Sequence, residues 1–187
     1  MAIPKRIQNG EKFTYEDYKT WNDSQDWEII GGKAYNMAPS PVTKHQKISG
    51  RIYLELGKFL ENKPCELYYE LDVVLSNEDI VKPDIFVVCD KTKLTEKNVQ
   101  GAPDLVVEIL SPNTALKDRN QKFEIYKKSG VKEYWIVDPY NLTIEVYDFE
   151  NDGKYLYGYN DEIEENMMEV LIFKGELKLD VNYILGD

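Results

Sequence analysis

Two acidic residues, Asp84 and Glu108, stand in apolar segments where a carboxylate needs a partner. Glu108 interrupts the aliphatic run 105–110, which prolines close on both sides, and Asp84 opens the apolar segment 85–89. An ionised carboxylate is costly to bury unless a cation, a hydrogen-bond donor or a raised pKa compensates. A divalent metal ion is one such partner. A structural lysine or arginine, or a position at a solvent-facing sheet edge, is the ordinary alternative.

Brought to one rim of a sheet, Asp84 and Glu108 would form a hard oxygen site suited to Mg²⁺ or Mn²⁺. A metal held there polarises a phosphoryl oxygen and lowers the pKa of a bound water. Such a site still lacks a positive group. Lys122, spaced on one helical face with Asp118 and Tyr126, could supply it, although a solvated helix face is the common fate of such a lysine. Aspartate, glutamate and lysine are the minimum set for metal-assisted phosphodiester hydrolysis.

Three further residues lie in segments that could reach the same site. Glu28 falls on the first strand of a predicted hairpin, where it would either join the acids as a catalytic residue or pair with a lysine. His45 and Gln46 stand near the start of a predicted helix and could face a substrate phosphate. For His45 we expect a surface position instead.

The elements that must position these residues follow from periodicity and turn signals. Gly31 and Gly32 form a two-residue turn between two short strands, and Gly130 supplies a left-handed helix stop. The strand–helix–strand over 104–137 has the length of a crossover unit and predicts a parallel strand pair. We expect helices over 14–21, 42–61 and 114–129, strands over 27–30, 33–37, 65–75, 85–89, 105–110, 133–137, 142–149 and 154–159, a strand–turn–strand over 168–179 and a last hydrophobic contact over 181–185.

These elements predict a single domain over residues 1–187 of the α/β (α+β) class, with a mixed central β-sheet flanked by helices, an N-terminal hairpin and C-terminal antiparallel strands. No apolar run approaches the roughly 20 residues of a membrane span, and the first residues lack the apolar centre of a signal peptide. Cys65 and Cys89 lack the spacing of a metal-binding pair, so we expect reduced thiols, a cytoplasmic protein and no structural zinc.

The net charge of −11 is unevenly distributed along the chain. Residues 139–187 hold 12 acidic residues against 3 lysines. Basic residues gather in the segments 44–51 and 117–132, which could form a local positive surface for nucleic acid or simply solvated helix faces.

Several motifs together resemble a known family. Lys82-Pro83-Asp84 followed by Glu108-Ile109-Leu110 resembles the PD…(D/E)xK pattern of the restriction-endonuclease-like superfamily. Within that superfamily the chain resembles the Uma-type family of endonucleases, through the motifs WEIIGG at 27–32, the helix start at His45, PDLVVEILSP at 103–112, the trio 118, 122 and 126, and GVKEYWIVDP at 130–139. The likeness spans residues 14–140.

The resemblance implies a restriction-endonuclease-like core, Mg²⁺ or Mn²⁺ as cofactor, DNA as substrate and a homodimer that cuts both strands. It makes Asp84 and Glu108 metal ligands. Leu110 stands where the superfamily pattern has lysine, and Lys122 would replace that lysine as the charge stabiliser.

Two other hypotheses remain compatible with these residues. The chain could be a non-catalytic binding or interaction module on the nuclease fold, with the acids kept for structure. It could also hydrolyse another phosphate ester, since the chemistry is the same.

Overall fold

The computed structural model describes residues 11–22, 25–37, 42–112 and 114–186. A mixed β-sheet lies at the centre of the fold. Within those ranges the sheet has six strands in the order β11-β10-β9-β8-β6-β3. All neighbours are antiparallel except β8 and β9, which are parallel. The strands are β3 (Glu66–Tyr69), β6 (Ile85–Val88), β8 (Leu105–Ile109), β9 (Glu133–Asp138), β10 (Thr143–Asp148) and β11 (Gly153–Gly158).

The parallel pair β8–β9 confirms the crossover predicted from sequence. Its connection is one continuous helical stretch, built from α3 (Ala115–Lys117), the π-helical turn η3 (Asp118–Lys122) and α4 (Phe123–Ser129). Gly130 ends it with a φ of 93°, in the left-handed region that favours glycine. The crossover therefore carries Asp118, Lys122 and Tyr126 back over the sheet that contains Glu108.

A second sheet lies beside the first. Among the described residues it has five strands, in the order β2-β1-β5-β4-β7. Its members are β1 (Trp27–Ile30), β2 (Lys33–Asn36), β4 (Val73–Ser76), β5 (Asp79–Val81) and β7 (Val99–Gln100). β1 and β2 form the predicted hairpin, and the turn glycines Gly31 and Gly32 have positive φ values of 57° and 77°.

The prediction of one strand over 65–75 is wrong, because this segment forms two strands that belong to different sheets. The chain leaves the six-stranded sheet after β3 and enters the five-stranded sheet as β4. Glu70 adopts a left-handed φ of 46° at this break. Strand propensity alone could not reveal the break, because both halves are rich in β-formers and differ only in the partners they find.

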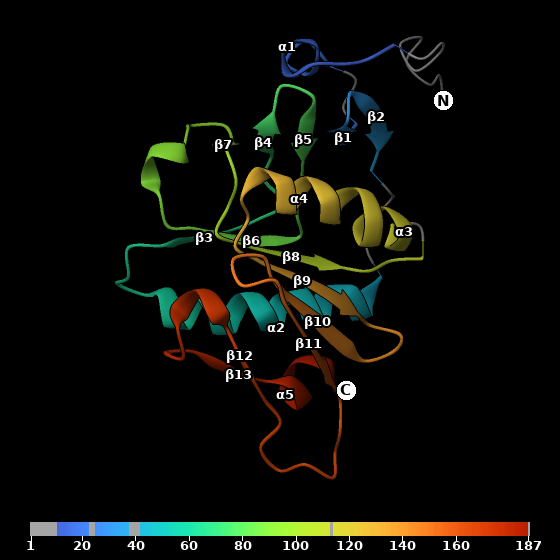
Figure 1. The fold of residues 1–187 in the computed structure, drawn as a ribbon. Coiled ribbons are helices and arrows are strands. Elements are labelled where there is room, and N and C mark those ends of the chain that lie inside the picture. Colours follow the sequence, from blue (N-terminus) through green and yellow to red (C-terminus); the bar gives the residue numbers. More distant parts are fainter. Residues whose placement is uncertain (1–10, 23–24, 38–41, 113, 187) are drawn as a thin grey trace.

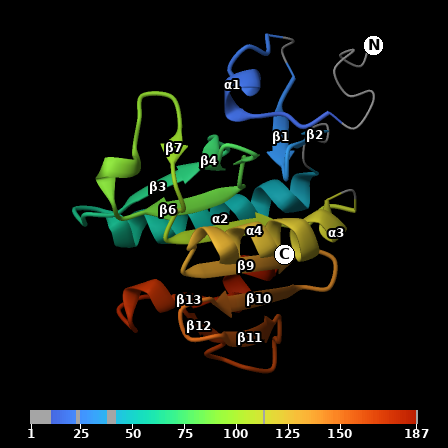
Figure 2. The same cartoon turned by 45° about the horizontal axis from the view of Figure 1, so that its top comes forward.

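Helices cover both faces of the six-stranded sheet (Figures 1 and 2). α2 (Thr43–Leu60) packs Ile48, Ile52 and Leu56 against one face, with Val87 and Val107 among their neighbours. α4 packs on the other face, where Tyr126 joins Phe86 and Val106 in a cluster that extends to the five-stranded sheet. Each helix thus buries one stripe and leaves its other side to solvent.

The remaining elements are short. α1 (Tyr15–Tyr18) begins with the predicted Thr14–Asp17 capping box, and 3₁₀ turns form at η2 (Lys91–Lys93) and η4 (Leu171–Phe173). The expected C-terminal strand–turn–strand is β12 (Met167–Glu169) with β13 (Lys178–Asp180). The segment 181–185, expected to make a last hydrophobic contact, forms the helix α5 (Val181–Leu185). Its N-cap Asp180 accepts hydrogen bonds from the N–H groups of Asn182 and Tyr183.

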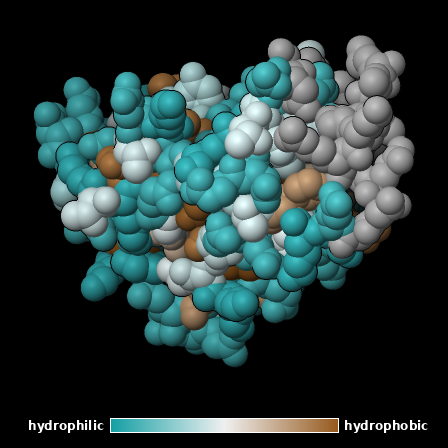
Figure 3. Space-filling model, turned by 90° about the horizontal axis from the view of Figure 1, so that it is seen from above, coloured by the Kyte–Doolittle hydropathy of each residue, from teal (hydrophilic) through white to brown (hydrophobic). Residues whose placement is uncertain are grey.

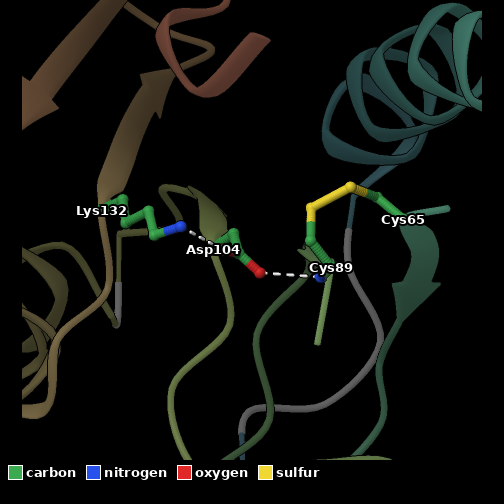
Figure 4. The surroundings of a disulfide bond; sticks show 4 residues. All are labelled: Cys65, Cys89, Asp104 and Lys132. Carbon is green, nitrogen blue, oxygen red and sulfur yellow. Dashed lines mark hydrogen bonds and ion pairs between the residues drawn. A yellow bond between two sulfur atoms is a disulfide. The ribbon is translucent and has the colours of Figure 1, made fainter. Parts of the chain in front are cut away.

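Cys65 and Cys89 form a disulfide, against the expectation of two reduced thiols. The antiparallel ladder between β3 and β6 pairs Glu66 with Val88, so the two cysteines are the next facing positions along it. Their Cα atoms are 3.9 Å apart. On the far side of Cys89 its N–H donates to Asp104, which also pairs with Lys132 (Figure 4). The pairing depends on strand register, which the cysteine spacing does not reveal.

The surface is strongly polar. Viewed from above, hydrophilic residues dominate, with small apolar patches between them (Figure 3). In the described part of the chain, no helix is both long enough and apolar enough to span a membrane.

Candidate active site

Asp84 and Glu108 meet across the antiparallel pair β6–β8. The last ladder pair is Ile85 with Val107, so Asp84 and Glu108 are the next two facing positions. Side chains alternate between faces along a strand, which puts both acids on the face that α4 covers. The sequence-based expectation that the two carboxylates share one rim of the sheet is therefore met by the backbone register.

Glu108 is buried and accepts two hydrogen bonds on a single oxygen. Lys122 Nζ lies 2.9 Å from Glu108 Oε1, and the Tyr126 hydroxyl donates to the same oxygen at 2.6 Å. Burial raises the pKa of Glu108 to about 8, although the Lys122 ammonium lowers it. The nearby carboxylates of Asp118, Asp84 and Glu28 add to the rise. Glu108 therefore takes up a proton much more readily than an ordinary glutamate, and a metal ion bound to it would have to displace that proton.

Lys122 lies among three carboxylates instead of facing solvent. Its Nζ is 2.7 Å from Glu28 Oε1, 2.9 Å from Glu108 Oε1 and 3.6 Å from Asp118 Oδ1. Burial lowers the pKa of Lys122, but these acids outweigh it and hold that pKa well above the usual range. The ammonium is therefore charged at every physiological pH.

Lys122 ends the π-helical turn η3, and Asp118 begins it. π turns inside α-helices are rare and are often found at functional sites. Asp118 itself is buried, and its Oδ1 atom has no hydrogen-bond partner among the residues that the structure describes. Burial raises the pKa of Asp118, and Lys122 lowers it by less.

Glu28 joins the site from β1 with no exposed surface. Glu28 Oε2 contacts Lys117 Nζ at 2.5 Å. Glu28 Oε1 contacts Lys122 Nζ and also accepts a hydrogen bond from the Lys82 N–H at 3.2 Å. Burial raises the pKa of Glu28, but the two ammonium groups prevail and lower it below its ordinary value. Glu28 thus pairs with two lysines and also reaches the other acids, while its catalytic role stays a prediction.

Among the described residues, the contacts that hold Asp84 are made to one of its two oxygens. Asp84 Oδ2 accepts the Ile109 N–H at 2.6 Å and lies 3.3 Å from His45 Nε2. Burial lowers the pKa of His45, but the hydrogen bond and charge of Asp84 raise it further, so the net shift is upward. Gln46, the neighbour of His45, is exposed on α2.

The surface position expected for His45 is wrong, because only 7% of the residue is exposed. The sequence held a signal for this: His45, Ile48, Ile52 and Leu56 recur at helical spacing, so His45 continues the buried stripe of α2. Sequence reasoning also gave no site role to Lys117, which carries no periodic signal of this kind.

These residues line one cleft with a volume of about 1350 Å³. Six acids and three lysines contribute to its walls, namely Asp26, Glu28, Glu70, Asp84, Glu108 and Asp118 with Lys82, Lys117 and Lys122. Ion pairs neutralise most of the basic segment 117–132: besides the lysines above, Arg119 pairs with Glu145, Lys127 with Asp152 and Lys132 with Asp104. That segment therefore does not form the free positive surface that the sequence suggested.

The carboxylate oxygens that accept no hydrogen bond in the described part of the chain fit a hard divalent cation. Asp84 Oδ1 and Glu108 Oε2 accept no hydrogen bond from the residues that the structure describes. In the same part of the chain, no three histidine, cysteine or acidic side chains are grouped closely enough to hold a metal by themselves. Two carboxylates suit Mg²⁺, which keeps several waters and binds through one or two protein oxygens. Zinc, which needs three or four protein ligands, does not fit.

Comparison with known proteins shows the family of this chain. Residues 15–182 match the model of the Uma2 family, which is described as "Putative restriction endonuclease". The chain belongs to the Uma2 family. This assignment and the fold confirm the resemblance to restriction-endonuclease-like proteins, and together they support a nuclease-like function for this Uma2 protein.

Relatives of this Uma2 protein include two uncharacterized proteins of Synechocystis sp. One, slr1290, is 29% identical over 161 residues, covering 82% of this chain and 84% of the relative. The other, sll1609, is 27% identical over 143 residues, covering 70% and 81%. A crystal structure from Anabaena variabilis, described as a "putative nuclease belonging to DUF820", is similar with a TM-score of 0.76 and 21% identity, covering 92% of this chain and 97% of that chain. At this identity the likeness establishes the shared fold.

Proposed function

We propose that this Uma2 protein is a metal-dependent endonuclease that hydrolyses DNA phosphodiester bonds. Asp84 and Glu108 would hold Mg²⁺ or Mn²⁺, and Lys122 would stabilise the charge that develops on the phosphate. The observation that carries the proposal is the facing pair of acids on β6 and β8, with the buried Lys122 ammonium 2.9 Å from Glu108.

The charge balance of the cleft supports a cation there. Within the described part of the chain, Glu28, Glu108 and Asp118 share two close ammonium groups, those of Lys117 and Lys122. An unmatched buried negative charge is costly, so either a proton or a cation must balance it. The raised pKa of Glu108 is consistent with the proton as the default occupant.

The protein's own groups then have distinct roles. Glu28 and Glu108 fix Lys122 in the wall of the cleft, where its ammonium would lie beside a phosphate bound at the two acids. His45 and the Ile109 N–H hold one oxygen of Asp84 and leave the other open. A bound divalent metal would supply Lewis-acid polarisation of the phosphate and a water of lowered pKa.

Nicking of supercoiled plasmid tests the proposal. Wild-type protein should nick DNA with Mg²⁺ or Mn²⁺ but not with EDTA, and Asp84→Asn, Glu108→Gln and Lys122→Met should each lower the rate at least about a hundredfold. Asp152→Asn, an exposed position paired only with Lys127, serves as the control. Nicking that survives both acid substitutions in purified protein would refute the assignment and indicate a contaminant.

The alternative, a non-catalytic binding module, is favoured by one observation: the Lys122 ammonium already contacts three acids of its own chain, at 2.7, 2.9 and 3.6 Å. In that case the network serves stability, and a well-packed apolar replacement is often tolerated or stabilising. Calorimetry with Mg²⁺ or Mn²⁺ separates the two hypotheses. Absence of metal binding, together with a raised melting temperature in Glu108→Gln or Glu108→Leu, would favour the module.

The proposal extends to a homodimer, because two-fold symmetric nucleases cut the two strands of DNA with two copies of one site. Light scattering coupled to size-exclusion chromatography measures the mass directly. A monomer at all concentrations would remove this part of the proposal without affecting the chemistry.

A further inference from the structure

Three apolar side chains stand exposed around the cleft that holds the acids. Val42 precedes α2, Leu116 lies on α3 and Tyr140 follows β9, and all three line the cleft. They are 54%, 81% and 61% exposed. Single exposed apolar residues are ordinary, but these come from three separate elements and converge on one opening. We call Val42, Leu116 and Tyr140 the apolar rim.

Tyr140 is held in place by its own turn. Asp138, the last residue of β9, accepts hydrogen bonds from the N–H groups of Tyr140 at 2.9 Å and Asn141 at 3.0 Å. Its other oxygen accepts the side chain of Asn141 at 2.8 Å and faces Arg119 at 3.7 Å. A fixed backbone presents the ring at low entropic cost, as binding surfaces that use tyrosine do.

The charges of the cleft do not suit a duplex backbone. Lys82 pairs with Asp26, Lys117 pairs with Glu28, and Lys122 pairs with Glu28 and Glu108. Every lysine lining the cleft is thus neutralised by a neighbour. Duplex and single-stranded DNA both gain affinity from cations that contact their phosphates, and the cleft offers few to either. Only unpaired bases can gain the further affinity of stacking on an aromatic ring. A ligand with an exposed aromatic surface fits the apolar rim better.

We propose that the cleft takes unpaired DNA, with bases stacking on Tyr140 and packing against Leu116 and Val42 while one phosphate reaches the acids. This inference rests on the proposed function, because it assigns the substrate class of the same site. Base stacking on aromatic side chains is tolerant of sequence, and it is available only where bases are not already stacked in a duplex. The expected substrates are single strands and unpaired segments within a duplex.

Binding and cleavage are measured separately on three labelled DNAs of the same sequence: a single strand, a perfect duplex and a duplex with a central mismatched bubble. Anisotropy in Ca²⁺ buffer gives binding, with a gel to verify that the DNA stays intact, and Mg²⁺ or Mn²⁺ buffer gives cleavage. The single strand and the bubble should bind at least about tenfold more tightly than the duplex. A single-stranded RNA of the same sequence is included to test for a preference between the two nucleic acids.

Tyr140→Ala should weaken binding of the single strand about tenfold, and Tyr140→Trp should restore it, because stacking needs a ring. The control is Tyr155→Ala, which removes an exposed tyrosine on β11 that does not line the cleft. Equal binding of duplex and single strand, no effect of Tyr140→Ala, or tighter binding of RNA would overturn the inference even if plasmid nicking succeeds. Binding of the single strand through Tyr140 without any metal-dependent cleavage would support the inference and refute the nuclease proposal.

Discussion

Lys122 contacts Glu108 at 2.9 Å from a different secondary-structure element, 14 residues further along the chain. The residue two positions after Glu108 is Leu110, which is buried in the cluster beneath α4. A lysine at that position would have to place its charge in an apolar environment. Instead, Lys122 in the helical stretch after β8 places its ammonium over the face of the sheet that holds Glu108. The contact between acid and lysine therefore forms although the lysine does not stand two positions after the acid.

Removal of Lys122 should strongly destabilise the fold. Lys122→Met leaves Glu28 and Glu108 buried with fewer cations, and breaking a buried ion pair on one side costs about 3–5 kcal/mol. Urea unfolding followed by circular dichroism measures the loss. Lys127→Met is the matched control, since Lys127 pairs with Asp152 at an exposed position and should change stability by less than about 1 kcal/mol.

Adding Glu108→Gln to Lys122→Met removes one of the stranded charges. The double variant should therefore be more stable than Lys122→Met alone, because coupled neighbours are not additive. The single variant Glu108→Gln completes the cycle, and a double variant whose loss of stability equals the sum of the two single losses would mean that the Lys122–Glu108 contact carries no interaction energy.

Metal binding should depend on pH through Glu108. The pKa of Glu108 is raised to about 8, so a metal must displace a proton below that pH. The apparent affinity for Mg²⁺ or Mn²⁺ should rise about tenfold per pH unit between pH 6 and 8 and level off above it. Calorimetry in buffers of different ionisation enthalpy measures the released proton. A flat profile in wild-type protein would show that Glu108 is not the titrating ligand.

His45 should matter for metal affinity more than for stability. It holds Asp84 Oδ2 at 3.3 Å, and loss of a residue that orients a metal ligand weakens binding about 10- to 100-fold. His45→Asn should show this loss by calorimetry while the protein stays folded. The control is Gln46→Ala, at the exposed neighbouring position. Identical affinities in the two variants would exclude a role for His45 in positioning Asp84.

Glu133 should make stability depend on pH independently of the site. It is buried on β9, where Trp135 Nε1 and the Ile172 N–H donate to its two oxygens. Burial raises the pKa of Glu133 to about 7, even though these hydrogen bonds lower it. A carboxyl whose folded pKa lies above its unfolded value favours folding at low pH, and this contribution is lost as the pH rises from about 4.5 through 7.

The measurement is the difference in unfolding free energy between wild type and Glu133→Gln at two pH values. From pH 5 to pH 8.5 wild type should lose on the order of 2 kcal/mol relative to the variant. Glu133→Gln lacks one hydrogen bond at every pH, which adds a constant to the difference in unfolding free energy. Only the change of that difference with pH is therefore informative. A constant difference would contradict a raised pKa for Glu133.

Local patterns in the sequence predicted the features that depend on local spacing. The Gly31–Gly32 hairpin, the stripe of α2 and the crossover over 104–137 were all recognisable, because periodicity and turn chemistry determine them within one segment. The alternation that puts Asp84 and Glu108 on one face is likewise local to each strand. The expectation that these two carboxylates lie close together depended, in addition, on β6 and β8 being neighbouring strands.

The features that sequence reasoning missed all depend on long-range register. The Cys65–Cys89 bond requires β3 to pair with β6 in one particular alignment, and the break at Glu70 requires a second sheet to receive β4. The pairing of Lys117 with Glu28 joins a helix to a hairpin 89 residues away. No local pattern encodes such partners, so a basic segment that looked free for nucleic acid is largely neutralised in the folded protein.

The π-helical turn Asp118–Lys122 has a consequence for protein engineering. A π turn accommodates one residue more than an ordinary helical turn. Deleting one residue between Asp118 and Lys122 would let the helix become regular, and the helix on either side would keep its phase because the π turn already absorbs the extra residue. The helix would then be intrinsically more favourable, but Asp118 and Lys122 would stand three positions apart instead of four, and the ammonium would be shifted from the acids that it contacts.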